Sequence, residues 1–334
     1  MPAGTPKIAV IIVNANTGEH IERALESLGA QTLAPARVIV VDNASTDGSP
    51  DAIVKRFPSV ELIRLDRNVG FAAANNLAVR AAEDCDWVAL LNPDAFPLKD
   101  WLTALARAIE RHPGYAFFGS RLVSAEQPSV LDGTGDVYHV SGLAWRRDHG
   151  RPATVAPQAG EIFSPCAAAA LYRRDAFLEV GGFDESYFCY FEDSDLAFRL
   201  RLAGQRCLYV PDAVVHHVGS VAAGRLSDFT VYHSFRNLVW TYAKNMPSPL
   251  VWLYLPQHVV AAGLTLAWFG LRGQGRLVLS SKRDALRELP RVLAQRRTIQ
   301  RARKASAREL RRAMATGVAK PALPIARRVR AESR

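Results

Sequence analysis

The chain has 334 residues, of which 49% are hydrophobic and 22% are charged. This composition supplies enough apolar material for a folded core, in one large domain or two modest ones, and excludes a largely disordered chain. The net charge of +10 belongs to the C-terminal end. Residues 282–334 hold 17 Lys or Arg and 4 Asp or Glu, a net +13, which leaves −3 for the first 281 residues.

The four cysteines, Cys85, Cys166, Cys189 and Cys207, lie far apart in the sequence and form no CxxC pair. No histidine stands at zinc-finger spacing from them, so the pattern argues against structural zinc or a disulfide framework and fits a reducing cytosol. The N-terminal segment carries one Lys before a short apolar run, without a cleavage site after it. It therefore predicts a first strand rather than a signal peptide.

Apolar β-branched runs alternate with amphipathic patterns along the first 112 residues. The runs predict strands at 7–14, 36–43, 60–66 and 86–92, and the patterns between and after them predict helices at 19–31, 49–57, 71–83 and 100–112. Continuous apolar strands separated by helices are typical of a mostly parallel sheet covered on both faces. The sequence thus predicts an α/β domain built from βαβ units.

Each predicted strand ends in a small polar cluster, at residues 14–16, 42–45, 66–68 and 92–94. Ligands of such sheets bind at the carboxyl ends of the strands, so the four clusters indicate one site. The alternative is that each cluster caps the helix that follows it. The last cluster, Asn92-Pro93-Asp94, fits either a structural turn or a metal site.

The periodicity weakens between residues 115 and 160, which are rich in Gly, Pro and charge. This segment fits a mobile loop over the site and equally well a surface decoration. Order resumes at residue 166, a strand is predicted from residue 207, and from residue 233 the pattern is helical and apolar until the Arg-rich end.

Three carboxylates, Glu192, Asp193 and Asp195, fall at the start of a predicted helix. Acids in a first turn are stabilised by the helix dipole, so capping is one interpretation. The aromatic segment SYFCYF precedes them, and a carboxylate among aromatic rings is partly desolvated and poised to act as a base.

Two adjacent histidines, His216 and His217, end a later predicted strand. A strand histidine can be an ordinary core residue, but together with Asp94 it can also form a cation site. One carboxylate cannot hold a divalent ion alone, and the oxygens of a substrate diphosphate would complete the octahedron. Such a metal offsets charge on a departing diphosphate, which indicates a nucleotide-diphosphate donor. The sequence contains no P-loop, no GxGxxG after a strand and no GxSxG elbow.

Six segments, in this order, resemble the family 2 glycosyltransferases with a GT-A fold, and among them the rhamnosyltransferase-like branch. The segments are VIIVNANTGEHIERALESL, VIVVDNASTDGS, NVGFAAANN, LLNPDA, VGGFDESYFCYFEDSDLAFRLRLAG and VPDAVVHHVGS, and the resemblance covers roughly residues 7–245. It implies a Rossmann-like, mostly parallel sheet flanked by helices, with a helical C-terminal extension. It also implies a nucleotide-sugar donor, inversion at the anomeric carbon by a single displacement, and Mg²⁺ or Mn²⁺ as cofactor.

The resemblance also assigns roles to individual residues. It implies that Asp42 binds the pyrimidine base and that the donor pocket is completed by Asn14, Asn16, Asn43, Asn68, Gly70, Asn76 and Asn92. Asp94 would bind the metal in a variant of the family's DXD motif, with His217, rather than His216, as a further ligand. Asp193 would be the general base for the acceptor hydroxyl, supported by Glu192 and Asp195. The sequence departs from the family pattern at Ala15, Ala74 and Asn92, so we expect altered pocket shape and weaker metal binding.

These observations divide the chain into a GT-A catalytic domain at 1–232, an apolar helical membrane-associating region at 233–290 and a basic tail at 291–334. Within the first, residues 1–114 would bind the nucleotide and residues 115–232 the acceptor. Residues 245–271 lack Asp, Glu, Lys and Arg. This stretch fits an interfacial hairpin interrupted at Pro256, a soluble helical core or a membrane span. With the basic tail it predicts a cytoplasmic enzyme held peripherally at the inner face of the cell membrane.

The expected reaction is transfer of a sugar, foremost L-rhamnose from dTDP-rhamnose, to a lipid-linked or polysaccharide acceptor in bacterial surface-glycan synthesis. UDP-galactofuranose and UDP-N-acetylhexosamine stay open as donors, and a nucleotidyltransferase or a non-catalytic paralogue are further alternatives. A different class is a protein that binds anionic lipid or nucleic acid through its basic tail. No nucleic acid is expected, since no aromatic residue follows Phe269.

Overall fold

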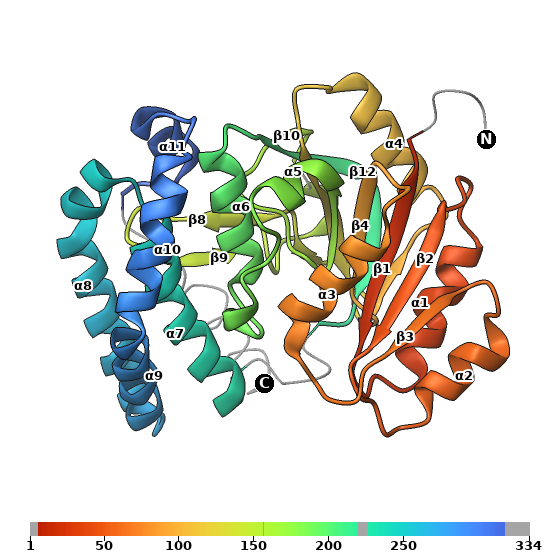
Figure 1. Ribbon diagram of the computed structural model, residues 1–334, viewed down its shortest axis with the longest axis horizontal. Coiled ribbons are helices and arrows are strands. Elements are labelled where there is room, and N and C mark those ends of the chain that lie inside the picture. Colours follow the sequence, from red (N-terminus) through yellow and green to blue (C-terminus); the bar gives the residue numbers. More distant parts are fainter. Residues whose placement is uncertain (1–5, 156, 220–225, 318–334) are drawn as a thin grey trace.

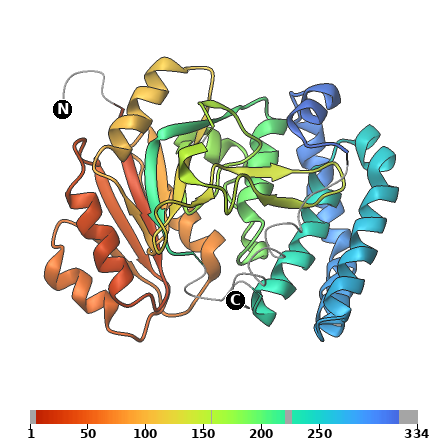
Figure 2. The same cartoon turned by 180° about the vertical axis from the view of Figure 1, so that it is seen from behind.

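The computed structural model describes residues 6–155, 157–219 and 226–317. They form one mixed sheet with helices on both faces and a layer of helices at one end of the molecule (Figure 1). The strand order is β10-β12-β6-β11-β4-β1-β2-β3. The view from behind shows the short strands β8 and β9 lying between the sheet and the helical end (Figure 2). The predicted α/β GT-A architecture is confirmed.

The N-terminal half of the sheet is parallel, as the alternating pattern predicts. It consists of β1 (Ile8–Asn14), β2 (Arg37–Asp42), β3 (Glu61–Arg64) and β4 (Trp87–Leu91). The helices between them and after them are α1 (Glu19–Gly29), α2 (Ser49–Arg56), α3 (Gly70–Ala81) and α4 (Trp101–Arg111). Asn14 is in register with Asp42 at the carboxyl ends of β1 and β2.

All seven residues of β1 are buried because side chains from both faces of the strand enter a core. Ile8, Val10 and Ile12 pack in the cluster that includes residues of α1, α2 and α4. Ala9 and Ile11 pack on the other face, in a cluster with residues of α3. This two-sided burial explains why the strand reads as a continuous apolar run.

The second half of the sheet brings distant segments beside β4. It contains β6 (Phe117–Ser124), β11 (Ala169–Arg173) and β12 (Cys207–His217), with β11 antiparallel to β4 and β6 parallel to β12. The short β5 (Ala95–Pro97) pairs with the end of β12, so that Ala95 lies opposite His217. This pairing carries Asp94 to the histidine at the end of β12.

Residues 115–160 are not a mere surface loop, because they form ordered strands that contribute to the site. Beyond β6, they contain β7 (Leu131–Gly133), β8 (Asp136–Tyr138), β9 (Ala144–Arg146) and the 3-10 turn η1 (Ala153–Val155). The elements that follow are β10 (Gly160–Glu161), α5 (Arg174–Glu179), the 3-10 turn η2 (Glu185–Tyr187) and α6 (Glu192–Leu202).

The C-terminal helices form a layer against the catalytic body. They are α7 (Asp228–Asn245), α8 (Ser248–Gly270), α9 (Gly275–Arg287), α10 (Leu289–Arg301) and α11 (Ala307–Ala313). The predicted domain boundaries at 232/233 and 290/291 fall inside α7 and α10. The described part of the basic tail is folded, since Leu310 and Met314 are buried in a cluster with Tyr138 and Phe198. Residues 318–334 of that tail lie outside the described residues.

The apolar stretch forms one continuous helix, α8, so the interfacial hairpin, one of the three alternatives left open by the sequence, is wrong. Pro256 lies inside the helix without ending it. His258 is buried, stacks on Tyr242 and bonds the carbonyl of Ser141 through Nδ1 (2.8 Å). These contacts fix α8 to the body along one face. By length and composition, α8 is the one helix among the described residues that could cross a membrane.

Candidate active site

Asp94 and His217 meet where β5 pairs with the end of β12. His217 Nε2 lies 3.5 Å from Asp94 Oδ1, and both side chains are more than nine-tenths buried. Asp94 Oδ2 accepts a hydrogen bond from the N–H of Gly219 (3.1 Å). His217 Nε2 has no hydrogen-bond partner within the described residues. A buried imidazole nitrogen and a carboxylate oxygen aimed at one point fit a divalent cation.

Asp132 orients His217 from the opposite side of the ring. His217 Nδ1 lies 2.8 Å from Asp132 Oδ2. Burial lowers the pKa of His217, but the two carboxylates outweigh this effect and raise it to about 9. Burial likewise opposes the contacts of Asp94 with His217 and Gly219, which hold the pKa of Asp94 below its usual value. A carboxylate behind a histidine ligand is the usual arrangement that fixes its ring, so Asp132 completes this corner.

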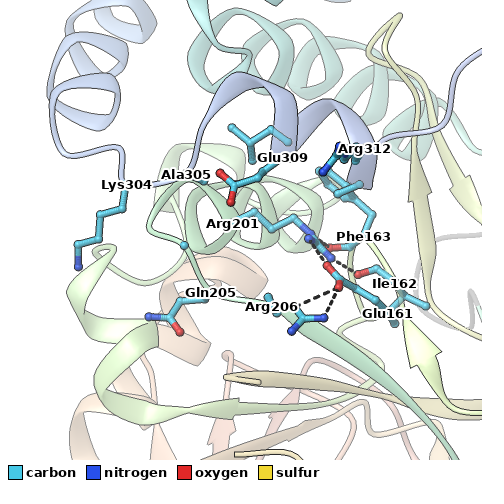
Figure 3. A pocket seen from close by; sticks show the side chains of 13 residues that line it. Glu161, Ile162, Phe163, Arg201, Gln205, Arg206, Lys304, Ala305, Glu309 and Arg312 are labelled. Atoms are coloured by element: carbon cyan, nitrogen blue, oxygen red, sulfur yellow. Dashed lines mark hydrogen bonds and ion pairs between the residues drawn. The ribbon is translucent and has the colours of Figure 1, made fainter. Parts of the chain in front are cut away.

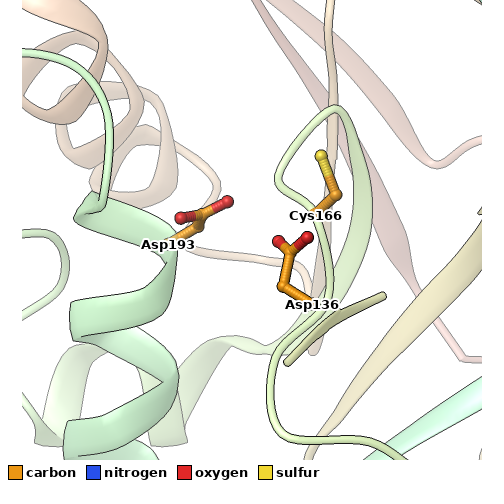
Figure 4. Close-up of side chains that lie close together, drawn as sticks. All are labelled: Asp136, Cys166 and Asp193. Carbon is orange, nitrogen blue, oxygen red and sulfur yellow. The ribbon is translucent and has the colours of Figure 1, made fainter. Parts of the chain in front are cut away.

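Arg146 connects this corner with a second pair of acids. Its Nη1 donates to Asp132 Oδ2 (2.8 Å) and its Nε donates to Asp136 Oδ1 (3.0 Å). Asp136, Cys166 and Asp193 turn their side chains toward one another, with ligand atoms within 4.8 Å (Figure 4). We call the connected set Asp94, His217, Asp132, Arg146, Asp136 and Asp193 the ionic series.

The cluster of Asp136, Cys166 and Asp193 is a poor place for a metal ion. Arg146 already supplies a cation to it. Burial raises the pKa of the Cys166 thiol well above its usual value, although Arg146 opposes the shift, so the thiol keeps its proton. A metal binds the thiolate, and a cation has better ligands at Asp94 and His217.

Asp193 and Glu192 begin α6 in a desolvated setting. Burial raises the pKa of Asp193, against the opposing hydrogen bond from Ser194 N–H and the charge of Arg146. Burial, with the neighbouring charge of Asp193, raises the pKa of Glu192 well above its usual value. Glu192 Oε2 is buried without a hydrogen-bond partner in the described part of the chain. A carboxylate with a raised pKa is suited to accept a proton near neutral pH.

Asp195 serves a different purpose from its neighbours. It is fully buried and forms ion pairs with Arg199 and Lys244, both at 2.8 Å. It also accepts a hydrogen bond from Asn245 Nδ2 (2.7 Å). Burial would raise the pKa of Asp195, but the two cations hold it low. Asp195 thus joins α6 to α7 and has no access to a ligand, so any support that it gives to Asp193 is indirect.

Two of the predicted donor residues are consumed by internal contacts. Asn14 is completely buried and donates from Nδ2 to Asp42 Oδ1 (2.9 Å) and Ser49 Oγ (2.8 Å). Asn76 is buried too, and its amide bonds the N–H and the carbonyl of Phe183, each at 2.8 Å. Both side chains are therefore engaged within the protein in this structure.

Four further predicted donor residues lie at the carboxyl edge of the sheet, Asp42 as the last residue of β2 and Asn16, Asn43 and Asn68 on loops. Asp42 and Asn43 are buried, like Asn14 and Asn76. Asn16 is exposed and accepts from Thr46 N–H (2.7 Å), and Asp42 accepts from Ser45 N–H (3.2 Å). Asn43 Nδ2 donates to Asn68 Oδ1 (2.8 Å), which also accepts from Gly70 N–H. These bonds join the loops after β1, β2 and β3.

Gly70 and Asn92 link these loops to the rest of the site. Gly70 has φ +87°, and a Cβ there would lie 2.6 Å from the Phe188 ring, so only glycine permits this close packing. Asn92 is partly buried and its N–H donates to the carbonyl of Ala168 (2.9 Å). The first contact places the start of α3 against the aromatic segment that precedes Glu192.

One hollow lies away from this chemistry. A cavity of about 550 Å³ opens between α11 and the β10–β12 edge, where Arg201 bonds Glu161 and the backbone of residues 162 and 163 (Figure 3). None of the predicted site residues lines it. Arg201 is almost fully buried and already paired, so this cavity adds no catalytic group.

Sequence reasoning missed Asp132, Asp136 and Arg146. They lie in the segment DGTGD at 132–136 and at the end of β9, inside the stretch that reads as a loop or a surface decoration. The available signal was the pair of acids separated by two glycines and followed ten residues later by arginines. Gly133 leaves room for Arg146, since a Cβ there would collide with Arg146 Cδ.

Two known proteins are similar over more than 60% of this chain. An N-acetylglucosaminyl-diphospho-decaprenol L-rhamnosyltransferase of Mycobacterium tuberculosis is 36% identical over 244 residues, which cover 66% of this chain and 79% of that protein. The rhamnosyltransferase WbbL of Escherichia coli K12 is 31% identical over 222 residues, covering 61% of this chain and 80% of the relative.

Solved structures share the fold at low sequence identity. A mannosyltransferase from Pyrobaculum calidifontis, in complex with GDP-Man and Mn²⁺, superposes with a TM-score of 0.53 at 20% identity, over 90% of this chain and 87% of that one. S. aureus TarS 1–349 superposes with a TM-score of 0.57 at 18% identity, over 91% and 89%. Residues 9–181, more than half of this chain, match the family model of glycosyl transferase family 2. The protein is a glycosyltransferase and belongs to that family.

Proposed function

We propose that the protein transfers L-rhamnose from dTDP-rhamnose to a lipid-linked N-acetylglucosamine, with inversion at the anomeric carbon. The observation that carries this proposal is the ionic series, which connects a donor-metal corner at Asp94 and His217 with a base at Asp193. The sugar and the acceptor are those named for the 36% identical relative. Production of a bacterial cell-surface glycan follows from that acceptor.

The proposed chemistry divides between the two ends of the ionic series. Asp94 and His217 would hold Mg²⁺ or Mn²⁺, which when bound offsets the charge of the leaving diphosphate. Asp193 accepts the proton of the acceptor hydroxyl as that oxygen attacks the anomeric carbon from the face opposite the diphosphate. Burial raises the pKa of Glu192 well above its usual value, which disfavours a second negative charge beside the base. The loops carrying Asn16, Asp42, Asn43 and Asn68 would hold the nucleotide.

A donor panel tests this function. We expect dTDP-rhamnose with Mn²⁺ or Mg²⁺ to raise the melting temperature of the purified protein more than UDP-galactofuranose, UDP-N-acetylglucosamine or GDP-mannose, because a bound ligand stabilises the native state. We expect rhamnosyl product with a polyprenyl-diphosphate N-acetylglucosamine acceptor, detected by mass spectrometry. If a UDP sugar gave the larger shift and the product, that sugar would replace dTDP-rhamnose as the proposed donor. No shift and no product with any donor would contradict the proposal.

We further propose that α8 places the enzyme on the cytoplasmic surface of the membrane. Only 17% of the most apolar part of α8 is buried in the protein. Its exposed side chains are large and apolar, and they recur at helical spacing: Trp252, Leu253, Val259, Val260 and Leu264. The exposed Arg272 and Arg276 follow at the C-terminal end of the helix. An apolar helix face beside cations suits an interface of anionic lipid, where the lipid-linked acceptor resides.

The membrane proposal predicts a large loss of vesicle binding on substitution of this face. In co-sedimentation with phosphatidylglycerol-containing vesicles, Trp252→Glu with Leu264→Glu should weaken binding at least about tenfold, since each buried apolar side chain contributes roughly 1.5–3 kcal/mol. Val54→Glu, at an exposed apolar position on α2, serves as the matched control and should bind like wild type. Equal binding by all three proteins would show that α8 does not contact lipid.

A further inference from the structure

Arg146 occupies a built position rather than a chance surface contact. Gly133 lacks the Cβ that would collide with the stem of the arginine, and Gly135, with φ +105°, lets the segment turn into β8. The carboxylates of Asp132 and Asp136 flank these glycines and hold two different nitrogens of the guanidinium. The segment DGTGD therefore forms a cradle for one arginine.

The Arg146 side chain is 28% exposed although three carboxylates surround it. Its Nε and Nη1 are engaged by Asp136 and Asp132, whereas no hydrogen bond from Nη2 is found among the described residues. Asp132 in turn holds His217, and Asp136 lies beside Asp193. The guanidinium contacts both Asp132, which holds the histidine of the donor-metal corner, and Asp136, which lies beside Asp193.

We propose that Arg146 is a positioning residue for the base Asp193. Its guanidinium, paired with Asp136, links Asp193 to the donor-metal corner and governs whether Asp193 carries a negative charge. The proposal rests on the proposed function for the role of Asp193 as the base. Arg146 pulls Asp136 and Asp132 together, so that the acceptor base and the histidine of the donor corner share one cation. The protonation of Asp193 therefore depends on whether Arg146 keeps its contact with Asp132 at the donor-metal corner.

Arg146 and Asp136 shift the pKa of Asp193 in opposite directions. The ionisable groups that face it from packed elements, and from its own segment, are Arg146 of β9, Asp136 of β8, Cys166 and Tyr172 around β11, and Cys189 and Glu192 beside it. The Arg146 cation lowers the pKa of Asp193. Burial, together with the like charge of Asp193 and only partly offset by Arg146, raises the pKa of Asp136 to about 7. By the same repulsion between like charges, a charged Asp136 disfavours the charged form of Asp193.

The sign of the expected pH shift therefore differs between two variants. Arg146→Gln removes a cation, so the pKa of Asp193 rises and the acid limb of the kcat profile moves to higher pH. Asp136→Asn removes a negative neighbour, so the pKa of Asp193 falls and the acid limb moves to lower pH. We expect each limb to move by about one pH unit, the usual effect of one neighbouring charge. At the optimum pH, kcat should fall roughly 10–100-fold in Arg146→Gln because the base is misplaced.

The test compares these variants with a matched control in the same segment. Asp148→Asn changes another acid of this region, which bonds Thr134 and pairs with Arg147 and Arg151, away from Asp193. Its φ of +57° suits asparagine as well as aspartate. It should leave the pH profile unchanged, and Arg146→Lys should restore part of the wild-type limb because it keeps the charge.

A second readout keeps the inference independent of turnover. Carbon-13 NMR of carboxyl-labelled aspartate, with the Asp193 signal assigned by its loss in Asp193→Asn, reports the pKa of Asp193 directly. Opposite shifts in Arg146→Gln and Asp136→Asn support the inference. Shifts of the same sign, or none, in folded variants overturn it. If wild type makes no glycoside while the opposite NMR shifts are found, the proposed function fails and the electrostatic coupling stands.

Discussion

Asp94→Asn should abolish metal-dependent donor binding and lower kcat about 10²–10³-fold. The substitution keeps the size of the side chain and its acceptor for the N–H of Gly219, but it removes the carboxylate that lies 3.5 Å from His217 Nε2. A bound divalent ion is expected to contribute several kcal/mol of charge stabilisation to the departure of the diphosphate, which corresponds to this loss of rate. Titration of Mn²⁺ into the protein with dTDP, followed by calorimetry, measures the binding, and a rhamnosyl-transfer assay measures the rate.

His216→Ala is the matched control for this prediction. His216 is adjacent to His217 on β12, but alternation along a strand directs its side chain to the other face. It should therefore retain metal-dependent binding and most of the activity, whereas His217→Ala should resemble Asp94→Asn. Full activity of Asp94→Asn without added metal would show that this corner does not hold the cofactor.

The sequence is sufficient to predict the parallel half of the fold because each element there carries its own local pattern. Strands β1, β2 and β4 are buried on both faces and read as continuous apolar runs, and the helices between them are amphipathic. The meeting of Asp94 with His217 is harder to predict, since it depends on pairing between β5 and β12, more than 110 residues apart. For that contact, the resemblance to a family predicted what the periodicity of the sequence does not.

Asp132, Asp136 and Arg146 escaped prediction for a physical reason. They stand on strands of three residues, which are too short to show a period of two. Their order comes from ion pairs and from the fit between Gly133 and Arg146 rather than from a run of apolar residues. A buried polar network leaves no periodic pattern in the sequence, although its glycines are a visible local signal.

Two predicted C-terminal boundaries fall inside helices, because charge dominates the sequence there while packing decides the structure. Residues after 290 look like a solvated basic tail, yet Leu310 and Met314 insert beside Tyr138. The backbone of Ala315 also bonds that of Tyr138 and Val140. A few apolar anchors are enough to fold an arginine-rich segment onto the body, and composition alone does not reveal them.

Asp193→Asn should lower kcat about 10²–10⁴-fold while leaving donor binding close to wild type, the range expected for loss of a general base. The side chain keeps its shape and can still accept a hydrogen bond from Ser194 N–H. It can no longer accept a proton from the acceptor hydroxyl. Burial raises the pKa of the native carboxyl, so wild-type activity should fall on the acid side at a pH above the usual titration range of aspartate. A pH series of the transfer rate measures that limb, and the residual rate of the variant should lack it.

Asp195→Asn, two residues along the same helix, should behave in the opposite way and thereby separates catalysis from architecture. Asp195 is fully buried between Arg199 and Lys244, so removing its charge leaves Arg199 without its carboxylate and Lys244 with Asp184 alone, and should cost roughly 3–5 kcal/mol of folding free energy. Thermal unfolding should report this loss, whereas Asp193→Asn should melt close to wild type. An Asp193→Asn protein that is folded, binds donor and retains the wild-type rate would remove Asp193 from the reaction and leave Glu192, whose Oε2 is buried without a hydrogen bond, as the base to examine.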